Sequence, residues 1–545
     1  MRLMSWAAIL GLFCLFAAEA GAEEVRIEQG RLRGETQEGI SSYLGVPFAA
    51  APLGELRWRA PAPPPSWRGV REARRFAPAC MQSGVSMPGE PHPEVSEDCL
   101  YLNIWAPRAR RAPVMVFIHG GGYTNGSTAL ALYSGERLAA RGVVVVTIAY
   151  RLGALGFLAH PDLTAEGAGS SGNYGLLDQI AALEWVRDNI AAFGGDPGNV
   201  TVFGQSAGAM AISLLMASPR ARGLFHRAIA QSGGVFEPIA LAPHYLLANA
   251  EADGLAFARA HGASSLTELR ALPVERLLEG AERISHPVIG SELLPLAPYD
   301  AYVLGEAADI PLIVGSNAEE ARSLIDVSGV TAATFRSHVT SHWGNLPAPL
   351  LDAYAPEAEE DAQANRLAFD RDLRFGWDMW AWARLHARHS TRPVYYYLFS
   401  HRPPFRGEPR SGWGAGHFAE LWYVFDNLVE GDGAWTAQDR ALADEVAGRW
   451  VSFARTGEPN LDGYPSWLEF TEVEPVLTDF GASRDVLRAP VDPRLRAFDA
   501  VYDSLRQAPA GPMMSAPQRG ATEAGPRARD AAAEHLRLVG RQRPR

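Results

Sequence analysis

The sequence contains no lysine, so all fifty basic residues of the 545-residue chain are arginines. Schiff-base catalysis and a phosphate-binding P-loop both require a lysine, and the composition therefore excludes both. The 62 acidic residues outnumber the basic ones and give a formal net charge of −12. Because no cationic surplus is available to neutralise phosphates, we expect no nucleic-acid partner.

Cysteine is also scarce, and the first of the three, Cys14, lies in a segment with the features of an export signal. Arg2 precedes an apolar stretch from Trp6 to Ala18, and small residues follow it, which is typical of a cleaved signal peptide, here residues 1–22. The stretch is short for a membrane span, and an interfacial anchor helix is the alternative. We expect a secreted or periplasmic protein with no stable membrane span after cleavage; the sequence leaves its oligomeric state open.

Two cysteines remain after cleavage, Cys80 and Cys99, which are 19 positions apart. In an oxidising compartment such a pair predicts a disulfide, which stabilises a fold by roughly 3 kcal/mol in the chain-entropy model. Neither cysteine has a histidine or another cysteine at ligand spacing, so a metal site is not expected there. The sequence predicts neither a metal nor a cofactor.

Apolar β-branched runs alternate with helical runs along residues 23–506, which we interpret as one domain. The runs Val114–Ile118 and Val143–Ala149 are almost continuously apolar, as strands buried on both faces are. Helical patterns at Gly175–Ile190 and Ala209–Met216 would cover such strands. The alternation predicts an α/β fold. Other candidate strands are Leu100–Trp105, Ala228–Gln231, Pro311–Gly315 and Val394–Phe399.

Three further segments complete the expected architecture. The alternating stretch Val25–Gly34, with Gly30 at its centre, predicts an antiparallel hairpin at the start of the sheet. Segments 246–302 and 331–389 have helical composition and are expected to cover the sheet and shape a pocket. Residues 507–545 are rich in proline, alanine and arginine and are expected to be disordered.

The most informative stretch is the pentapeptide Gly204–Gly208 (GQSAG), between the predicted strand Asn199–Phe203 and a predicted helix. A serine at such a corner is held in a strained backbone conformation that only small neighbours tolerate, and the strain exposes its hydroxyl. This arrangement is the nucleophile elbow of α/β-hydrolases. Bare G-x-S-x-G matches also arise by chance in a chain with 53 glycines, so the interpretation depends on partners for Ser206.

A cluster of glycines follows the predicted strand Val114–Ile118, in the sequence His119-Gly-Gly-Gly-Tyr123. Glycines lack a Cβ atom, so their N–H groups can converge on a shared cavity, as an oxyanion hole requires. A plain glycine-rich turn is the alternative, and the spacing does not match a phosphate-binding loop. The candidate donors are the N–H groups of Gly121, Gly122 and Ala207.

A serine nucleophile also needs a base and an acid that orients the base. His417 is the candidate base because it ends the flexible stretch Gly412–Gly416 late in the chain, and the order serine, acid, histidine is that of α/β-hydrolases. The acid is expected between them, where the predicted strand Pro311–Gly315 leads into a loop with Glu319 and Glu320. Spacing alone does not choose between the two glutamates.

Six motifs occur along the chain in a fixed order. They are Ser96–Asn103 (SEDCLYLN), His119–Gly122 (HGGG), Asn173–Asp178 (NYGLLD), Phe193–Pro197 (FGGDP), Gly204–Gly208 (GQSAG) and Thr456–Asn460 (TGEPN). Together they resemble the type-B carboxylesterase family, which includes the cholinesterases and bacterial para-nitrobenzyl-type esterases. The resemblance runs from about residue 25 to residue 496 and implies an α/β-hydrolase fold with a large, mostly parallel sheet and helical insertions that form the pocket.

The resemblance also implies roles for individual residues. Ser206 would be the nucleophile, Glu320 the acid and His417 the base. The implied oxyanion hole falls on the three N–H groups named above, and the implied disulfide on the two remaining cysteines. Implied structural ion pairs are Arg57 with Glu97 and Arg151 with Asp178. Candidate residues for contact with substrate are Gln205, Phe236, Phe375 and Phe418.

Three departures from the family pattern bear on specificity. Gln205 stands where the family usually has glutamate, so a neutral amide replaces a carboxylate near the site. Ala321 and Phe418 stand where glycine is common, and they add bulk after the acid and the base. The loop between the two cysteines, residues 80–99, has no aromatic residue. Cholinesterases place a cation-binding tryptophan there, so choline esters are not expected as substrates.

The sequence therefore predicts a serine carboxylic-ester hydrolase that acts on a small-molecule ester through an acyl-enzyme. Two alternatives are a lipase acting at interfaces and a catalytically silent, adhesion-type member of the same fold. The aromatic residues Trp377, Trp380 and Trp382, near Phe375, fit either an acyl pocket or the core at their helical spacing.

Overall fold

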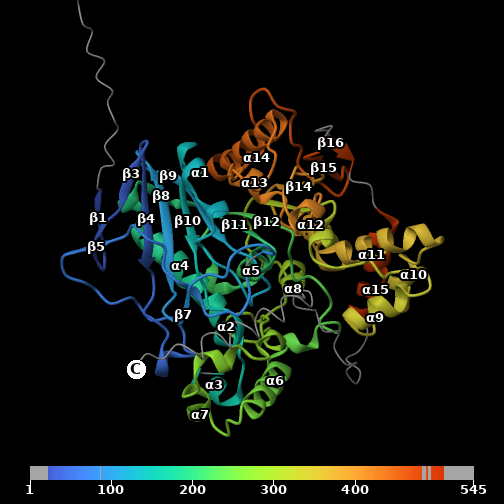
Figure 1. Ribbon diagram of the computed structural model, residues 1–545, viewed down its shortest axis with the longest axis horizontal. Helices are drawn as coiled ribbons and strands as arrows, with labels where there is room; N and C mark the ends of the chain where they lie inside the picture. Colours follow the sequence, from blue (N-terminus) through green and yellow to red (C-terminus); the bar gives the residue numbers. More distant parts are fainter. Residues whose placement is uncertain (1–22, 86, 168, 482–485, 489–491, 508–545) are drawn as a thin grey trace, which may run out of the picture.

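The computed structural model describes residues 23–85, 87–167, 169–481, 486–488 and 492–507 (Figure 1). The predicted signal peptide and residues 508–545 of the predicted tail lie outside the described residues. Gln507, which the sequence assigned to the tail, is the last residue of a helix. No helix in the described ranges combines the length and apolar character needed to cross a membrane.

An eleven-stranded sheet forms the centre of the molecule. From one edge to the other its strands are β3 (Glu35–Gln37), β4 (Ile40–Pro47), β8 (Tyr101–Pro107), β10 (Val144–Ile148), β9 (Ala112–Ile118), β11 (Gly195–Gln205), β12 (Arg227–Gln231), β13 (Leu312–Asn317), β14 (Val394–Phe399), β15 (Val476–Asp479) and β16 (Val486–Arg488). All neighbours from β10 to β15 pair in parallel, and pairing at both edges is antiparallel. The predicted α/β fold with a large, mostly parallel sheet is confirmed.

Both faces of the sheet are covered by helices, as the apolar strands predicted. In β9, Val114, Val116 and Ile118 belong to one hydrophobic core, while Met115 and Phe117 belong to another. Helices α4 (Tyr174–Asn189), α5 (Ala207–Ala217) and α12 (Trp377–His389) pack into the first core. Helices α1 (Glu136–Ala140), α13 (Leu421–Val424) and α14 (Ala437–Thr456) pack into the second.

The N-terminal hairpin forms as predicted but belongs to a different sheet. β1 (Glu24–Ile27) and β2 (Gly30–Arg33) pair antiparallel, and both join β5 (Val70–Glu72) in a separate three-stranded sheet. The chain passes from β2 into β3 through Gly34. A Cβ added there would lie 2.7 Å from Tyr43 Cδ1, so a side chain would clash with that ring. The antiparallel start of the large sheet is therefore β3 and β4, which the sequence did not reveal.

The two helical segments between strands are confirmed and lie beside the sheet (Figure 1). The first contains α6 (Leu247–Ala260), α7 (Leu266–Arg270) and α8 (Pro298–Val303). The second contains α9 (Phe335–Trp343), α10 (Ala348–Asp352), α11 (Ala362–Arg371) and α12, and α15 (Pro493–Gln507) packs with it. The remaining α-helices and strands in the described ranges are α2 (Gly153–Phe157), α3 (Pro161–Glu166), β6 (Ala79–Cys80) and β7 (Val95–Ser96).

Candidate active site

Ser206 lies at the corner between β11 and α5. Its backbone has φ 56° and ψ −126°, a conformation that costs free energy in any residue with a side chain. The flanking glycines explain the sequence pattern, because a Cβ at Gly204 would lie 2.8 Å from Ile118 O and one at Gly208 would also contact that oxygen. The end of β9 thus packs directly against the corner, and only glycine fits two residues before and two residues after the serine.

The glycine loop after β9 lies next to this corner. Gly121 and Gly122 have φ values of 111° and 61°, and a Cβ at Gly120 would lie 2.9 Å from Ser206 Cβ. In the described part of the chain, no hydrogen bond is donated by the N–H of Gly121, Gly122 or Ala207. Ala207 also begins α5, where the helix dipole favours negative charge. These three donors are free to bind an anionic oxygen.

Glu320 and His417 form a buried pair near the carboxyl ends of the central strands. Glu320 Oε2 is 2.6 Å from His417 Nδ1, and both side chains are buried. The N–H of Asn317 donates to the other carboxylate oxygen, Oε1, at 2.7 Å. A histidine that donates its Nδ1 proton to a carboxylate keeps Nε2 unprotonated, and Nε2 is then the atom that can accept a proton.

Glu319 has a different environment from its neighbour. Its carboxylate pairs with Arg402 at 2.6 Å and accepts the N–H of Ala415 at 3.0 Å. It contacts the loop before His417 but not the imidazole. Spacing alone left the two glutamates open, and the structure brings to the histidine the one that the family resemblance implied, Glu320.

The serine and histidine loops are joined through Gln205. No hydrogen bond among the described residues links the Ser206 hydroxyl to His417, but Gln205 Nε2 donates to the main-chain oxygen of His417 at 2.6 Å. Serine–histidine hydrogen bonds are often long before substrate binds and shorten in the complex. The Gln205 side chain is buried and is turned toward the backbone of the histidine loop.

The candidate pocket residues occupy two positions. Phe375 stacks on the imidazole of His417, with ring centroids 4.2 Å apart and planes at 12°, and Phe418 contacts the same ring at 4.9 Å. Phe236 is fully buried and packs on Trp382 at 5.1 Å. Phe375 and Phe418 are thus beside the histidine, whereas Phe236 belongs to the core under α12.

Two of the tryptophans near Phe375, Trp377 and Trp380, are buried against different neighbours. Trp377 packs on Tyr502 of α15, with ring centroids 4.5 Å apart. The Arg384 guanidinium carbon lies 3.5 Å from the ring centroid of Trp380. Both indoles are buried. For these two residues the structure favours the core interpretation of the aromatic stripe.

Sequence reasoning missed a second buried carboxyl behind the pair, that of Glu420. Its oxygens accept from Asn317 Nδ2 at 2.5 Å and from Gln231 Nε2 at 3.1 Å. Burial, and after it the charge of Glu320, raise the pKa of Glu420 to about 8. The available signal was an acidic residue inside an apolar run, one helical turn after His417.

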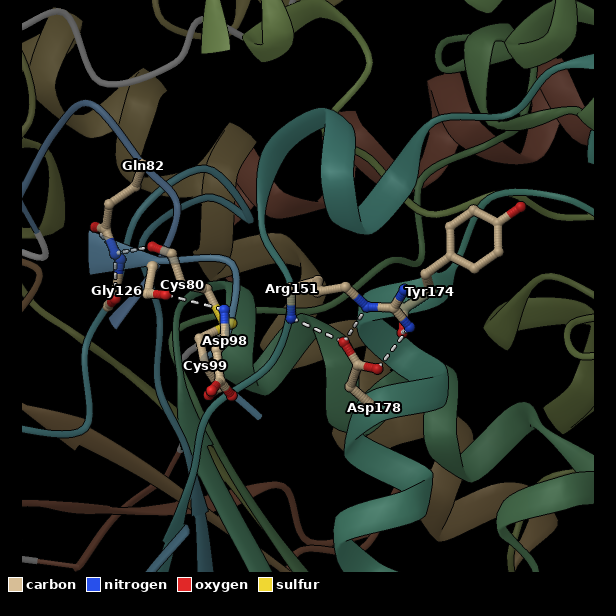
Figure 2. Close-up of a disulfide and its surroundings, with 9 residues drawn as sticks. Cys80, Gln82, Asp98, Cys99, Gly126, Arg151, Tyr174 and Asp178 are labelled. Atoms are coloured by element: carbon tan, nitrogen blue, oxygen red, sulfur yellow. Dashed lines mark hydrogen bonds and ion pairs between the residues drawn. A yellow bond between two sulfur atoms is a disulfide. The ribbon is translucent and has the colours of Figure 1, made fainter. Parts of the chain in front are cut away.

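The disulfide and both ion pairs implied by the family resemblance are present. Cys80 and Cys99 are bonded, with Cα atoms 4.9 Å apart (Figure 2). Arg151 pairs with Asp178 at 2.7 Å, and Arg57 pairs with Glu97 at 2.5 Å. Within the described ranges, no group of three or more histidine, cysteine, aspartate or glutamate side chains is arranged to hold a metal ion.

Known proteins are similar to this chain in sequence and in fold. The sequence model of the Carboxylesterase family matches residues 21–489. The chain is 39% identical over 464 residues to a fumonisin B1 esterase of Sphingopyxis macrogoltabida, with 81% of this chain and 84% of that protein covered. It is 35% identical over 483 residues to a para-nitrobenzyl esterase of Bacillus subtilis (strain 168), with 82% and 93% covered.

Solved structures agree with the sequence comparison. A para-nitrobenzyl (PNB) esterase structure superposes with a TM-score of 0.75 at 32% identity, covering 87% of this chain and 99% of that one. A Geobacillus stearothermophilus carboxylesterase superposes with a TM-score of 0.75 at 35% identity, with the same coverage. The fold is therefore the α/β-hydrolase fold, and the chain belongs to the carboxylesterase family of carboxylic-ester hydrolases.

Proposed function

We propose that the protein hydrolyses small-molecule carboxylic esters through an acyl-enzyme formed on Ser206. The serine oxygen attacks the ester carbonyl carbon while His417 Nε2 accepts the hydroxyl proton. The histidine gives that proton to the leaving alcohol as the carbon–oxygen bond breaks. A water molecule, deprotonated by the same histidine, then attacks the acyl-enzyme, and the acid and the free serine are released.

Glu320 and the three free N–H groups support these steps. Glu320 holds the imidazole in the tautomer that exposes Nε2 and stabilises the imidazolium that forms. The N–H groups of Gly121, Gly122 and Ala207 would stabilise the oxyanion of each tetrahedral intermediate, at roughly 3 kcal/mol for each donor. The proposal needs no metal or cofactor.

The observation that carries the proposal is the 2.6 Å contact between Glu320 and His417, behind a serine held at a strained corner. It is tested by Ser206→Ala, assayed with a short-chain nitrophenyl ester. Ser213→Ala is a matched control, because Ser213 lies on the same helix and donates to Met210 O at 2.7 Å. We expect Ser206→Ala to lose turnover and the burst of nitrophenol while the control keeps both; equal turnover by Ser206→Ala and the native enzyme would refute the mechanism.

The two alternative functions, an interfacial lipase and a silent adhesion-type protein, predict different kinetics. An interfacial lipase would show a rate increase once its ester exceeds the solubility limit, which we do not expect. An adhesion-type protein without activity would show no burst. The complete set of serine, glutamate, histidine and free N–H groups favours an active esterase over a silent binding protein.

The proposed substrates are carboxylic esters without a quaternary ammonium group, because the 80–99 loop carries no aromatic residue. One relative is named a fumonisin B1 esterase, so fumonisin B1 belongs in the first panel of esters, beside nitrophenyl esters of increasing acyl length and acetylcholine. We also propose secretion or periplasmic export, which the disulfide and the N-terminal sequence support.

A further inference from the structure

Gln82 binds both main-chain groups of one residue, Gly126, with the two ends of its amide (Figure 2). Gly126 ends the glycine loop, residues 119–126. Its Oε1 accepts the N–H of Gly126 at 2.8 Å, and its Nε2 donates to Gly126 O at 2.6 Å. The same Nε2 donates to Cys80 O at 3.0 Å. The side chain is buried, so water does not replace these hydrogen bonds at low cost.

Gly126 in turn packs against the start of the loop that carries the proposed oxyanion donors. A Cβ at Gly126 would contact the His119 ring and would lie 2.9 Å from Gly120 O. Burial lowers the pKa of His119 to about 4, so its ring is neutral, and its Nδ1 donates to Gly120 O at 2.9 Å. Gly120 itself lies against Ser206. Holding Gly126 therefore holds the first residues of the loop beside the serine.

A second hydrogen bond connects the same two segments. Asn125 Oδ1 accepts the N–H of Gly84 at 2.9 Å, and the N–H of Asn125 donates to Gly121 O at 3.0 Å. The segment after Cys80 thus contacts the glycine loop at two successive residues, Asn125 and Gly126. Of these two, Asn125 is hydrogen-bonded directly to Gly121, a proposed donor residue.

The base of this support is cross-linked. Cys80 is joined to Cys99, and β6 pairs with β7 through Cys80 and Ser96. Gln82 is only two residues from the disulfide. Its backbone therefore has little freedom to move relative to the rest of the segment between Cys80 and Cys99. Oxyanion donors that are backbone N–H groups have no side chain of their own to adjust, and displacements near 1 Å are costly for such groups.

We infer that Gln82 is a positioning residue for the proposed oxyanion hole, holding the glycine loop through Gly126 from a disulfide-anchored base. The inference rests on the proposed function. The hydrogen bonds of Gln82 go to Cys80 and Gly126, not to the proposed nucleophile. It acts by fixing where the N–H groups of Gly121 and Gly122 point, and its contribution should appear when the oxyanion forms.

The test compares Gln82→Glu with the native enzyme at equal concentrations of titrated active sites. The new carboxylate oxygen would replace the Nε2 donor that faces Cys80 O and Gly126 O, and repulsion would displace the loop. We expect kcat for a nitrophenyl ester to fall at least about tenfold, with KM changed by less than about threefold, because the donors bind the transition state more strongly than the ground state. Gln82→Met removes the hydrogen bonds without charge and serves if the first variant does not fold.

A trifluoromethyl ketone supplies the second measurement. Ser206 Oγ would add to its carbonyl carbon, the hydroxyl proton would pass to His417, and the ketone oxygen would become an alkoxide facing the donors. We expect its inhibition constant to rise in parallel with the loss of kcat, whereas inhibition by the planar product acid should change by less than about threefold.

The matched control is Asn173→Asp. Asn173 binds both main-chain groups of Val288 in the same two-ended way: its Nδ2 donates to Val288 O at 2.7 Å, and its Oδ1 accepts the N–H of Val288 at 2.8 Å. We expect it to lose stability but to keep kcat per titrated site. An unchanged kcat in both Gln82 variants, or an equal loss in Asn173→Asp, would overturn the inference. Absence of ester hydrolysis by the native enzyme would instead overturn the proposed function.

Discussion

Gln205 Nε2 donates to the main-chain oxygen of His417 at 2.6 Å, so the residue before the proposed nucleophile holds the loop of the proposed base. The two residues are 212 positions apart in sequence. Where the family resemblance leads us to expect glutamate, this chain uses an amide as a structural donor, and a carboxylate could not donate there unless it were protonated. The substitution therefore has a geometric consequence as well as an electrostatic one.

Gln205→Glu is expected to impair hydrolysis in a pH-dependent way. A protonated glutamic acid can still donate to His417 O, whereas an ionised one would place a negative oxygen against that carbonyl. The ratio of kcat/KM between variant and native enzyme should therefore fall as pH rises, measured with a nitrophenyl ester at several pH values. Gln205→Met, which cannot ionise, should give a ratio that does not change with pH; the same flat ratio for Gln205→Glu would contradict the expectation.

The adjacent glutamates 319 and 320 offer a matched pair of isosteric substitutions. Glu320→Gln would no longer hold the imidazole in the useful tautomer or stabilise the imidazolium, and a loss of kcat on the order of 10³- to 10⁴-fold is expected. Glu319→Gln removes a partly exposed ion pair with Arg402 and should change kcat less than about fivefold. Steady-state kinetics decide the assignment, and a larger loss in Glu319→Gln would reverse it.

Spacing alone could not separate these glutamates, and only the family resemblance chose Glu320; the reason is local geometry. Both follow β13. Glu319, with φ −125° and ψ 34°, precedes a short 3₁₀ turn that starts at Glu320, and only Glu320 contacts the His417 ring. By contrast, the GQSAG corner was predictable, since Gly204 and Gly208 are required by contact with the end of β9. Steric requirements of glycine leave a direct mark on sequence, and the direction of a loop side chain does not.

Long-range polar contacts were equally hidden. Glu420 accepts from Asn317, which is 103 residues earlier, and neither residue belongs to a pattern that announces the contact. The hairpin of β1 and β2 shows the same limit: alternation around Gly30 predicted the pairing, but the choice of sheet depends on β5, some forty residues later. Local patterns define elements, while partners across the fold depend on how the elements pack.

Glu420 should make the protein less stable as pH rises toward 8. Its pKa in the folded protein is about 8, against an ordinary value of 4.5, so the folded state retains a proton that the unfolded chain has lost. The unfolded state therefore binds fewer protons between these values, and the free energy of unfolding falls with rising pH. From pH 6.5 to 7.5 the free energy of unfolding should fall more steeply for the native protein than for Glu420→Gln, by up to roughly 1.4 kcal/mol per pH unit.

Chemical denaturation at several pH values measures both slopes. Glu420→Gln will also lose some stability at every pH, since its amide N–H₂ meets the donors of Asn317 or Gln231, so the slope rather than the absolute value is diagnostic. The exposed Glu430→Gln is the control and should keep the native slope. Parallel curves for native protein and Glu420→Gln would show that Glu420 does not carry this proton.

Loss of the disulfide should reduce both stability and turnover. Closing a loop between cysteines 19 positions apart stabilises the fold by roughly 3 kcal/mol in the chain-entropy model. The double variant Cys80→Ala, Cys99→Ala should therefore have a free energy of unfolding that is lower by about that amount. If the disulfide also steadies Gln82, kcat per titrated site should fall in the double variant while KM changes little, measured where the variant is fully folded. Dithiothreitol should reproduce the loss in the native enzyme and leave the double variant unaffected. A double variant with lower stability and native kcat would restrict the disulfide to holding the fold together and would separate it from the glycine loop.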